Sequence, residues 1–402
     1  MSELGPSGGQ GGNPFGFLGD LMKMFITDGP LNWQIARQAA LVAATGGEPE
    51  PNVDPLERLR MEELLRVADL HVSDATGLAT SPTGLISVRA VTRAEWAYYT
   101  LDHYRTLFEG LAGALTSTGD AGGPADPFAA MAEGGDLEAG LLGSLPQVLG
   151  PFFLGAQAGT MCGHLARQAM GQYELPIPRP VSGELMVVPA TITTFAADWS
   201  LPVDDVRLWV CLSELSHHAV LSRPHVRQRL DSLLDEYVRG FRVDPTALST
   251  QLEQLDLANP SSLPELFNNP EALLGAVTTA AQHEVEARLA AIVCAIEGYV
   301  DHIVDVVGHR LIQSYGPLSE ALRRRRVTPS DADQLIRELF GLELSQAAYD
   351  RGDRFVHGVL ERAGDAGLSR LWRSERELPT PAEVDAPGLW LERIDLTDGD
   401  PG

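Results

Sequence analysis

Residues 206–221 read VRLWVCLSELSHHAVL, and they hold the most informative pattern in the chain. Val206, Val210, Ser213, His217 and Val220 follow one another at intervals of three or four residues, which predicts a helix with one inward face. Ser213 and His217 fall on that same face, and Glu214 lies on its flank. The segment therefore predicts a buried helix that carries a histidine, a carboxylate and a serine close together.

The order of these residues indicates a chemistry. Two histidines at i and i+4 of a helix can hold one metal ion, and a glutamate after the first histidine can take a proton from the metal-bound water. Residues 213–217 read Ser-Glu-Leu-Ser-His. Glu214 thus fits the general base and His217 fits a metal ligand, but Ser213 stands where the first histidine should be. A lone helical histidine is more often a hydrogen-bonded core residue, so this helix alone does not establish a metal site.

A second helical stretch, ARLAAIVCAIEGYVDHIVDVVG at residues 287–308, strengthens the pattern. Glu297 interrupts its apolar face, and a buried carboxylate needs a metal, a cation or good hydrogen bonds. Asp301 follows one turn later on the same side. Glu-x-x-x-Asp can supply a carboxylate ligand and an aspartate that supports a ligand histidine from behind. Pairing of either carboxylate with an arginine is the alternative.

Together with GPLNWQIARQAA and LGAQAGTMCGHLARQAMGQYELPIP, these segments resemble a family of bacterial zincin-like proteins regarded as hydrolases of the zinc-dependent metalloprotease type. The resemblance covers most of the chain. It implies a zincin-like metallopeptidase fold in which Glu214 is the base, His217 and Glu297 are zinc ligands and Asp301 stands behind them. Because Ser213 departs from the pattern, the chain resembles a branch whose His-Glu-x-x-His motif is degenerate.

Three other histidines lie near the motifs, and none fits the missing position. His218 points about 100° away from His217 around the helix, His302 lies off the face of Glu297, and His225 would have to fold back. We therefore expect weak or absent Zn²⁺ binding. The hypothesis is a catalytically impaired protein retained for binding or scaffolding, with a peptide or protein in the old cleft. The alternative is an active zinc peptidase with a substitute ligand.

Two further metal-site or nucleophile interpretations find little support. A di-iron centre would need a second Glu-x-x-His motif on another helix, and none lies in a suitable helical stretch. Ser213 and His217 as nucleophile and base lack a nucleophile elbow. The run LRRRRV, with Arg323–Arg326, is expected to form a solvated basic face paired with surplus acidic residues.

Composition limits the partners. The 402 residues carry a formal charge of −25, which opposes binding to a nucleic acid or to an anionic membrane surface. Three widely spaced cysteines in apolar stretches indicate reduced, buried thiols, and we see no secretory signal, so a cytoplasmic protein is expected. Residues 139–166 contain no charged side chain. Their prolines and glycines favour a buried helix over a membrane span.

The expected fold class is mainly α with a small β element. The clearest strand pattern is Glu184–Ala196, whose edge could receive an added peptide strand, although Pro189 interrupts it. Asp204 or Asp205 is expected to cap the helix that follows. We expect a Gly/Pro-rich tail at 1–28, a helical region at 29–180, a zincin-like core at 181–376 and an acidic tail at 377–402.

Overall fold

The computed structural model describes residues 29–81, 84, 86–116, 137–180, 182–241, 280–327 and 331–398. The expected N-terminal tail, residues 1–28, lies outside this set. The elements are α2 (Trp33–Thr45), α3 (Pro55–Thr76), β1 (Ser87–Ala90), α4 (Arg93–His103), α5 (Arg105–Thr116), α7 (Leu137–Gln168), β2 (Glu184–Val187), α8 (Pro189–Asp198), α9 (Val203–Leu221), α10 (Pro224–Arg239), α14 (Ala280–Leu311), α15 (Tyr315–Val327), α16 (Asp331–Phe340), α17 (Gln346–Leu368), η2 (Ser369–Trp372), η3 (Glu375–Glu377), α18 (Pro381–Asp385) and α19 (Pro387–Asp398). The chain is mainly α with a small sheet, as the sequence predicts.

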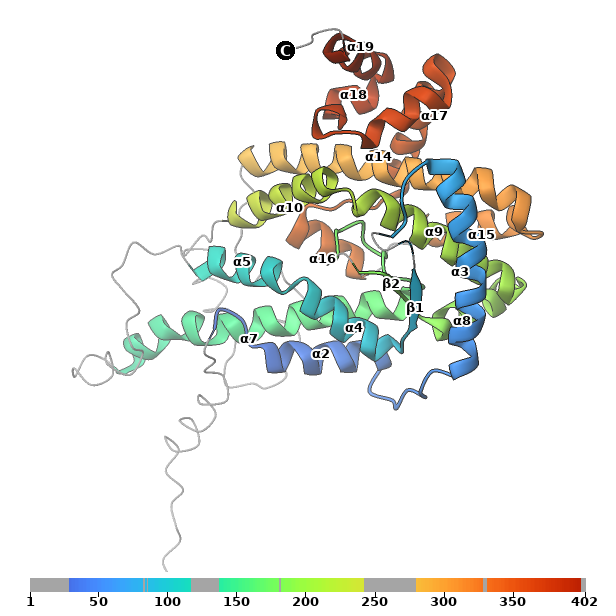
Figure 1. The fold of residues 1–402 in the computed structure, drawn as a ribbon. Helices are drawn as coiled ribbons and strands as arrows, with labels where there is room; N and C mark the ends of the chain where they lie inside the picture. Colours follow the sequence, from blue (N-terminus) through green and yellow to red (C-terminus); the bar gives the residue numbers. More distant parts are fainter. Residues whose placement is uncertain are drawn as a thin grey trace, which may run out of the picture.

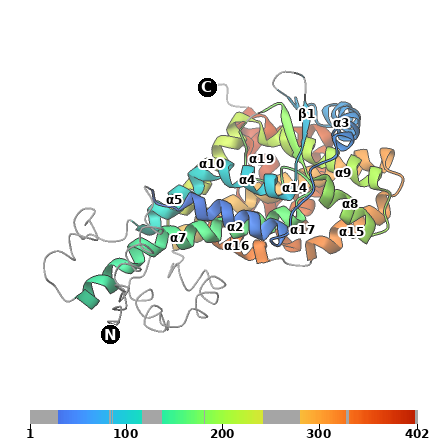
Figure 2. The same cartoon turned by 90° about the horizontal axis from the view of Figure 1, so that it is seen from below.

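The long helix α14 runs across the molecule, with α9 and α10 on one side and α17 to α19 on the other (Figure 1). On the far side of α9 and α10, helices α2, α4 and α7 form another layer (Figures 1 and 2). The apolar side chains of these layers make one continuous core. Helix α14 is therefore positioned to bring its own residues against α9 deep inside the molecule.

Helix α7 contains most of the charge-free stretch and packs along α2. Gly159 and Gly163 lie against α2 and Gly155 lies against its N-cap residue, Asn32, so that an added Cβ at any of the three would collide with backbone. Their spacing places them on one face, so the two backbones approach closely. From Pro151 to Ala166, where burial is described, the stretch is a largely buried part of this helix. None of the helices within the described ranges is long and apolar enough to cross a membrane.

The predicted strand is shorter than expected. Only Glu184–Val187 is strand, and it pairs in parallel with β1, with Ser87 opposite Glu184. Pro189 occupies the first turn of α8, where its missing N–H has no cost and its fixed φ suits a helix. The other edge of β2 meets Met170 and Gly171. One edge of β2 is thus paired with β1 and the end of its other edge is bonded within the chain, so less of the strand is left for an added peptide than expected.

Two other expectations are wrong. Neither Asp204 nor Asp205 caps α9: its N-cap is Pro202, which makes no side-chain cap. Both aspartates lie in the first turn, where a negative charge interacts favourably with the helix dipole. Asp205 also accepts hydrogen bonds from the backbone N–H and the hydroxyl of Ser314. Residues 377–398 are also not an extended tail. They form the end of η3 and helices α18 and α19, anchored by the fully buried Trp390.

Candidate functional site

The predicted residues of α9 and α14 meet in the core. His217 of α9 donates a hydrogen bond from Nε2 to Oε1 of Glu297 on α14 across 3.2 Å. Both side chains are almost fully buried. The valine-lined face of α9 and the apolar face of α14 pack together, and each carries one polar group inward. The spacing on the two helices thus brings together the two residues expected to be metal ligands.

Both ring nitrogens of His217 face acceptors. Nδ1 lies 2.9 Å from the backbone oxygen of Ser213, and Nε2 lies against the Glu297 carboxylate. An imidazole donates to two acceptors only when both nitrogens carry a proton. Burial lowers the pKa of His217, but the charge and hydrogen bond of Glu297 outweigh it and raise the pKa to about 9. His217 is therefore an imidazolium paired with Glu297 at neutral pH.

Glu214 makes a different set of contacts. Its Oε2 accepts the backbone N–H of Gln172 at 2.8 Å and that of Tyr173 at 3.0 Å. Gly171 passes so close that an added Cβ would overlap the carboxylate. Burial raises the pKa of Glu214 to about 7, against the opposing effects of His217 and the two N–H groups. Glu214 thus fixes the connection between α7 and β2.

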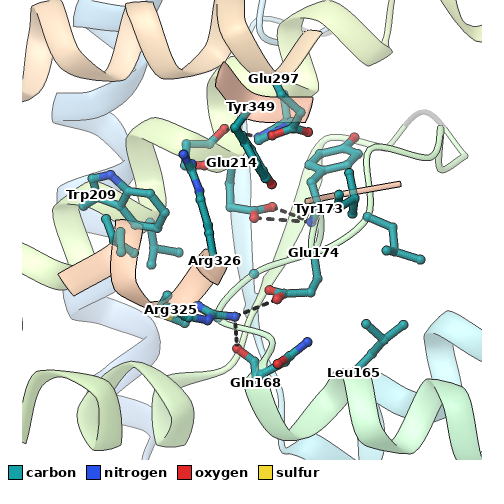
Figure 3. A pocket seen from close by; sticks show the side chains of 18 residues that line it. Leu165, Gln168, Tyr173, Glu174, Trp209, Glu214, Glu297, Arg325, Arg326 and Tyr349 are labelled. Atoms are coloured by element: carbon teal, nitrogen blue, oxygen red, sulfur yellow. Dashed lines mark hydrogen bonds and ion pairs between the residues drawn. The ribbon is translucent and has the colours of Figure 1, made fainter. Parts of the chain in front are cut away.

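Ser213, Glu214, His217 and Glu297 all line one pocket of about 140 Å³. Figure 3 shows it between α9, α14, α15, α17 and the segment after α7. Tyr173 lies over the imidazole of His217, with the ring centroids 5.9 Å apart. Where a histidine would project from position 213, the serine leaves open space in the pocket.

Asp301 is bound by an arginine. Arg326 of α15 reaches both carboxylate oxygens of Asp301, at 2.6 and 2.7 Å. Its guanidinium lies over the ring of Tyr349, 3.9 Å from the centroid. Burial lowers the pKa of Arg326, but Asp301, Tyr349 and Glu297 together raise it. The support expected from Asp301 for a ligand histidine stays a prediction; in this structure its carboxylate lies in the ion pair with Arg326.

The arginine run divides between the surface and the pocket. Arg323 and Arg324 pair with Glu320 on the exposed side of α15. Arg325 bonds to Glu174 at 2.6 Å and to the backbone oxygen of Gln168, as Figure 3 shows. The expected pairing of these arginines with acidic residues is confirmed. The expected solvated face holds only for Arg323 and Arg324, because Arg325 and Arg326 line the pocket. Sequence reasoning missed this role, as it missed Tyr173 and Tyr349, because no motif marks them.

None of the three alternative histidines lines this pocket. Nδ1 of His218 is bonded to the hydroxyl of Tyr173 at 2.8 Å, and burial with the nearby charge of Arg227 lowers its pKa to about 4. His302 lines a separate pocket bordered by α3. His225 stands in the first turn of α10.

The donor set can be compared with what a zinc ion requires. Catalytic zinc takes three protein ligands, and each histidine ligand must be deprotonated. Here one nitrogen donor, Nε2 of His217, and one carboxylate, that of Glu297, converge. Among the described residues, no group of three or more His, Cys, Asp or Glu side chains is arranged to hold a metal. The side chains present therefore do not fit a three-ligand zinc centre.

Comparisons with known proteins agree with the fold. The zincin-like metallopeptidase family matches residues 31–391. A crystal structure from Chloroflexus aurantiacus, described as a proposed hydrolase with a novel fold, is similar with a TM-score of 0.62 and 24% identity, over 91% of this chain and 99% of that chain. No curated protein matches. Because the family match spans nearly all the described helices, including α9 and α14, this chain belongs to the zincin-like metallopeptidase family.

Proposed function

We propose that this protein uses the zincin-like fold for binding and not for zinc-dependent hydrolysis. The observation that carries the proposal is that the remaining catalytic positions are satisfied inside the protein. Glu214 accepts two backbone N–H groups, and His217 donates to Ser213 and Glu297. A general base must instead face the metal-bound water, and a ligand histidine must offer a lone pair.

The pocket supports a particular kind of binding. Its volume of about 140 Å³ is below the roughly 300–1,000 Å³ of common small-molecule sites. Such a space accepts one side chain of a peptide or protein, with the rest of the partner outside. Ser213 contributes the opening, because a larger residue there would fill it. We therefore assign the pocket to recognition of a single side chain of a partner.

Zinc content tests the missing-ligand part of this proposal. Protein purified at neutral pH without chelator or nickel resin is analysed for metal as wild type, Ser213→His and Ser213→Ala. We expect well under one zinc per chain in wild type and in the alanine control. Ser213→His should approach one, because Nε2 of His217 and Oε1 of Glu297 are already 3.2 Å apart, close to the separation of two ligands on one zinc.

An active enzyme with a substitute ligand is the second candidate, and the raised pKa of Glu214 at the pocket wall favours it. That candidate predicts one tightly bound zinc in wild type, lost in His217→Ala, with peptidase activity that depends on Glu214. Wild-type protein that behaves in this way would refute the binding proposal.

The recognition part needs its own experiment. Peptides selected on the wild-type protein from a displayed library should lose affinity at least tenfold for Ser213→Leu, which fills the pocket. Leu389→Ala, at an exposed site on α19, is the control and should bind normally. Equal binding to wild type and Ser213→Leu would place the peptide site elsewhere.

A further inference from the structure

Helix α3 is apolar on two opposite faces. Its inner face packs against α9 and α14 through the buried residues Met61, Leu65, Ala68 and Val72. At 100° per residue, Leu56, Leu59, Val67 and Leu70 form a stripe about 180° away from that face. These four side chains are 55%, 56%, 42% and 73% exposed. A surface helix of a globular protein normally carries polar residues there.

The stripe lies on the outside of the molecule. Figure 2 shows α3 nearly end-on at the edge of the molecule, with α9 and α14 on its inner side. Four of the ten large apolar residues recorded as exposed in the described ranges belong to this one helix. Exposed apolar residues that gather on one face of one helix, in place of being scattered singly, indicate an interaction site.

The spacing of the stripe identifies the partner. Counted outward from Glu63, leucines stand seven residues away on both sides, at 56 and 70, and apolar residues stand four away, at 59 and 67. The pattern therefore reads nearly the same in both directions. About a two-fold axis, residue i of one copy contacts residue j of the other, and residue j of the first contacts residue i of the second. With the axis at position 63, apolar residues of one copy would therefore face apolar residues of the other. We propose that two copies of this protein dimerise through antiparallel α3 helices, with the axis at Glu63.

The charges at the centre agree with this arrangement. Glu63 and Arg66 are exposed, and neither has an ion pair within the described parts of the chain. In the antiparallel pair, Glu63 lies one helical turn from the partner's Arg66, and the reverse holds by symmetry. The two Arg66 guanidinium groups, which pair with no acidic residue within the described ranges, thereby offset the like charges of the two Glu63 carboxylates.

The area that two α3 helices can bury indicates how tightly the dimer would hold together. Specific interfaces bury about 1,200–2,000 Å² in total, and one pair of 22-residue helices reaches only the low end. Symmetry also places the partner's residues 52–55 opposite His71 and Asp74, on the rim of a pocket of about 460 Å³ between α3 and α14. We therefore expect a reversible dimer with a Kd on the order of micromolar.

Sedimentation of the full chain from about 1 to 200 µM tests the dimer. Wild type should pass from monomer to dimer, and Leu59→Glu with Leu70→Glu should stay monomeric with unchanged helicity. Leu389→Glu is the matched control, since Leu389 is 53% exposed on another helix and should leave the dimer intact. A monomer at every concentration, or equal effects of the two variants, would overturn the proposal.

A cysteine at the axis tests the geometry separately. Glu63→Cys should form a disulfide between two copies under mild oxidation, because residues on the axis face each other. Arg58→Cys, also exposed on α3 but turned more than 100° from the stripe, should not. The three native cysteines are buried and do not interfere. Equal cross-linking at both positions would exclude an axis at Glu63, even for a protein that dimerises.

Discussion

His217 and Glu297 lie 80 residues apart in the chain, and their side chains meet at 3.2 Å between α9 and α14. This contact joins the two residues that the sequence analysis expects to be metal ligands. The buried imidazole of His217, whose pKa is raised by Glu297, places a positive charge between the two helices. Four predictions follow the buried groups around this contact.

The first prediction concerns His217 and pH. Its pKa of about 9 in the folded protein exceeds the value near 6.5 of an exposed histidine. The native state therefore binds the proton more tightly, so this stabilisation is complete below pH 6.5 and is lost as the pH rises through 9. Between these values wild type should lose about 1–3 kcal/mol more unfolding free energy than His217→Gln, measured by urea denaturation.

His218→Gln is the control for that measurement. The pKa of His218 is lowered to about 4, so its contribution changes only below pH 6.5. The slope of this variant above pH 6.5 should match wild type. A wild-type slope that survives in His217→Gln would mean that another group titrates in this range.

The second prediction concerns the charge of Glu214. Its pKa of about 7 lies above the usual 4.5, so the folded state again holds the proton more tightly. Stability from this group is present below pH 4.5 and is lost as the pH rises through 7. Glu214→Gln keeps an acceptor for the N–H groups of Gln172 and Tyr173 and should flatten stability between pH 4.5 and 7. An unchanged profile would contradict the prediction.

The third prediction concerns the close approach of Gly171 to Glu214. Gly171→Ala should lower the free energy of unfolding by about 1–3 kcal/mol, because the new methyl group overlaps the carboxylate. Glu214→Ala should cost a similar amount by leaving two buried N–H groups without an acceptor. The double variant should cost less than the sum, since the shortened side chain makes room for the methyl group. Strict additivity would show that the two residues do not interact.

The fourth prediction concerns the packing of α14 on α17. A Cβ at Gly352 would overlap the carbonyl oxygen of Cys294, and backbone cannot move aside as a flexible side chain can. Gly352→Ala should therefore destabilise the protein by about 1–3 kcal/mol or more. Gly316→Ala in α15, where nothing lies within 4 Å, should be neutral or stabilise by up to about 1 kcal/mol. Thermal unfolding compares the two, and equal shifts would contradict the close contact.

Local spacing in the sequence predicts the site helices and the side chains that share a face. Ser213 and His217 lie on one face of α9, and Glu297 lies on the buried face of α14, as their spacing predicts. A helix repeats every 3.6 residues, so such relations depend only on near neighbours in the chain. The short β1 was missed because four residues give no clear alternation and its partner strand is about a hundred residues away.

The contacts of each buried polar group depend on how distant parts of the chain pack together. Glu214 is held by the N–H groups of Gln172 and Tyr173, and Asp301 is taken by Arg326 of α15. Sequence spacing cannot give these pairings, because they depend on how helices cross and on where a connection passes over them. The same local pattern could have formed a metal centre. The Glu214 carboxylate is turned toward the N–H groups of Gln172 and Tyr173, and His217 holds its proton because Glu297 lies beside it.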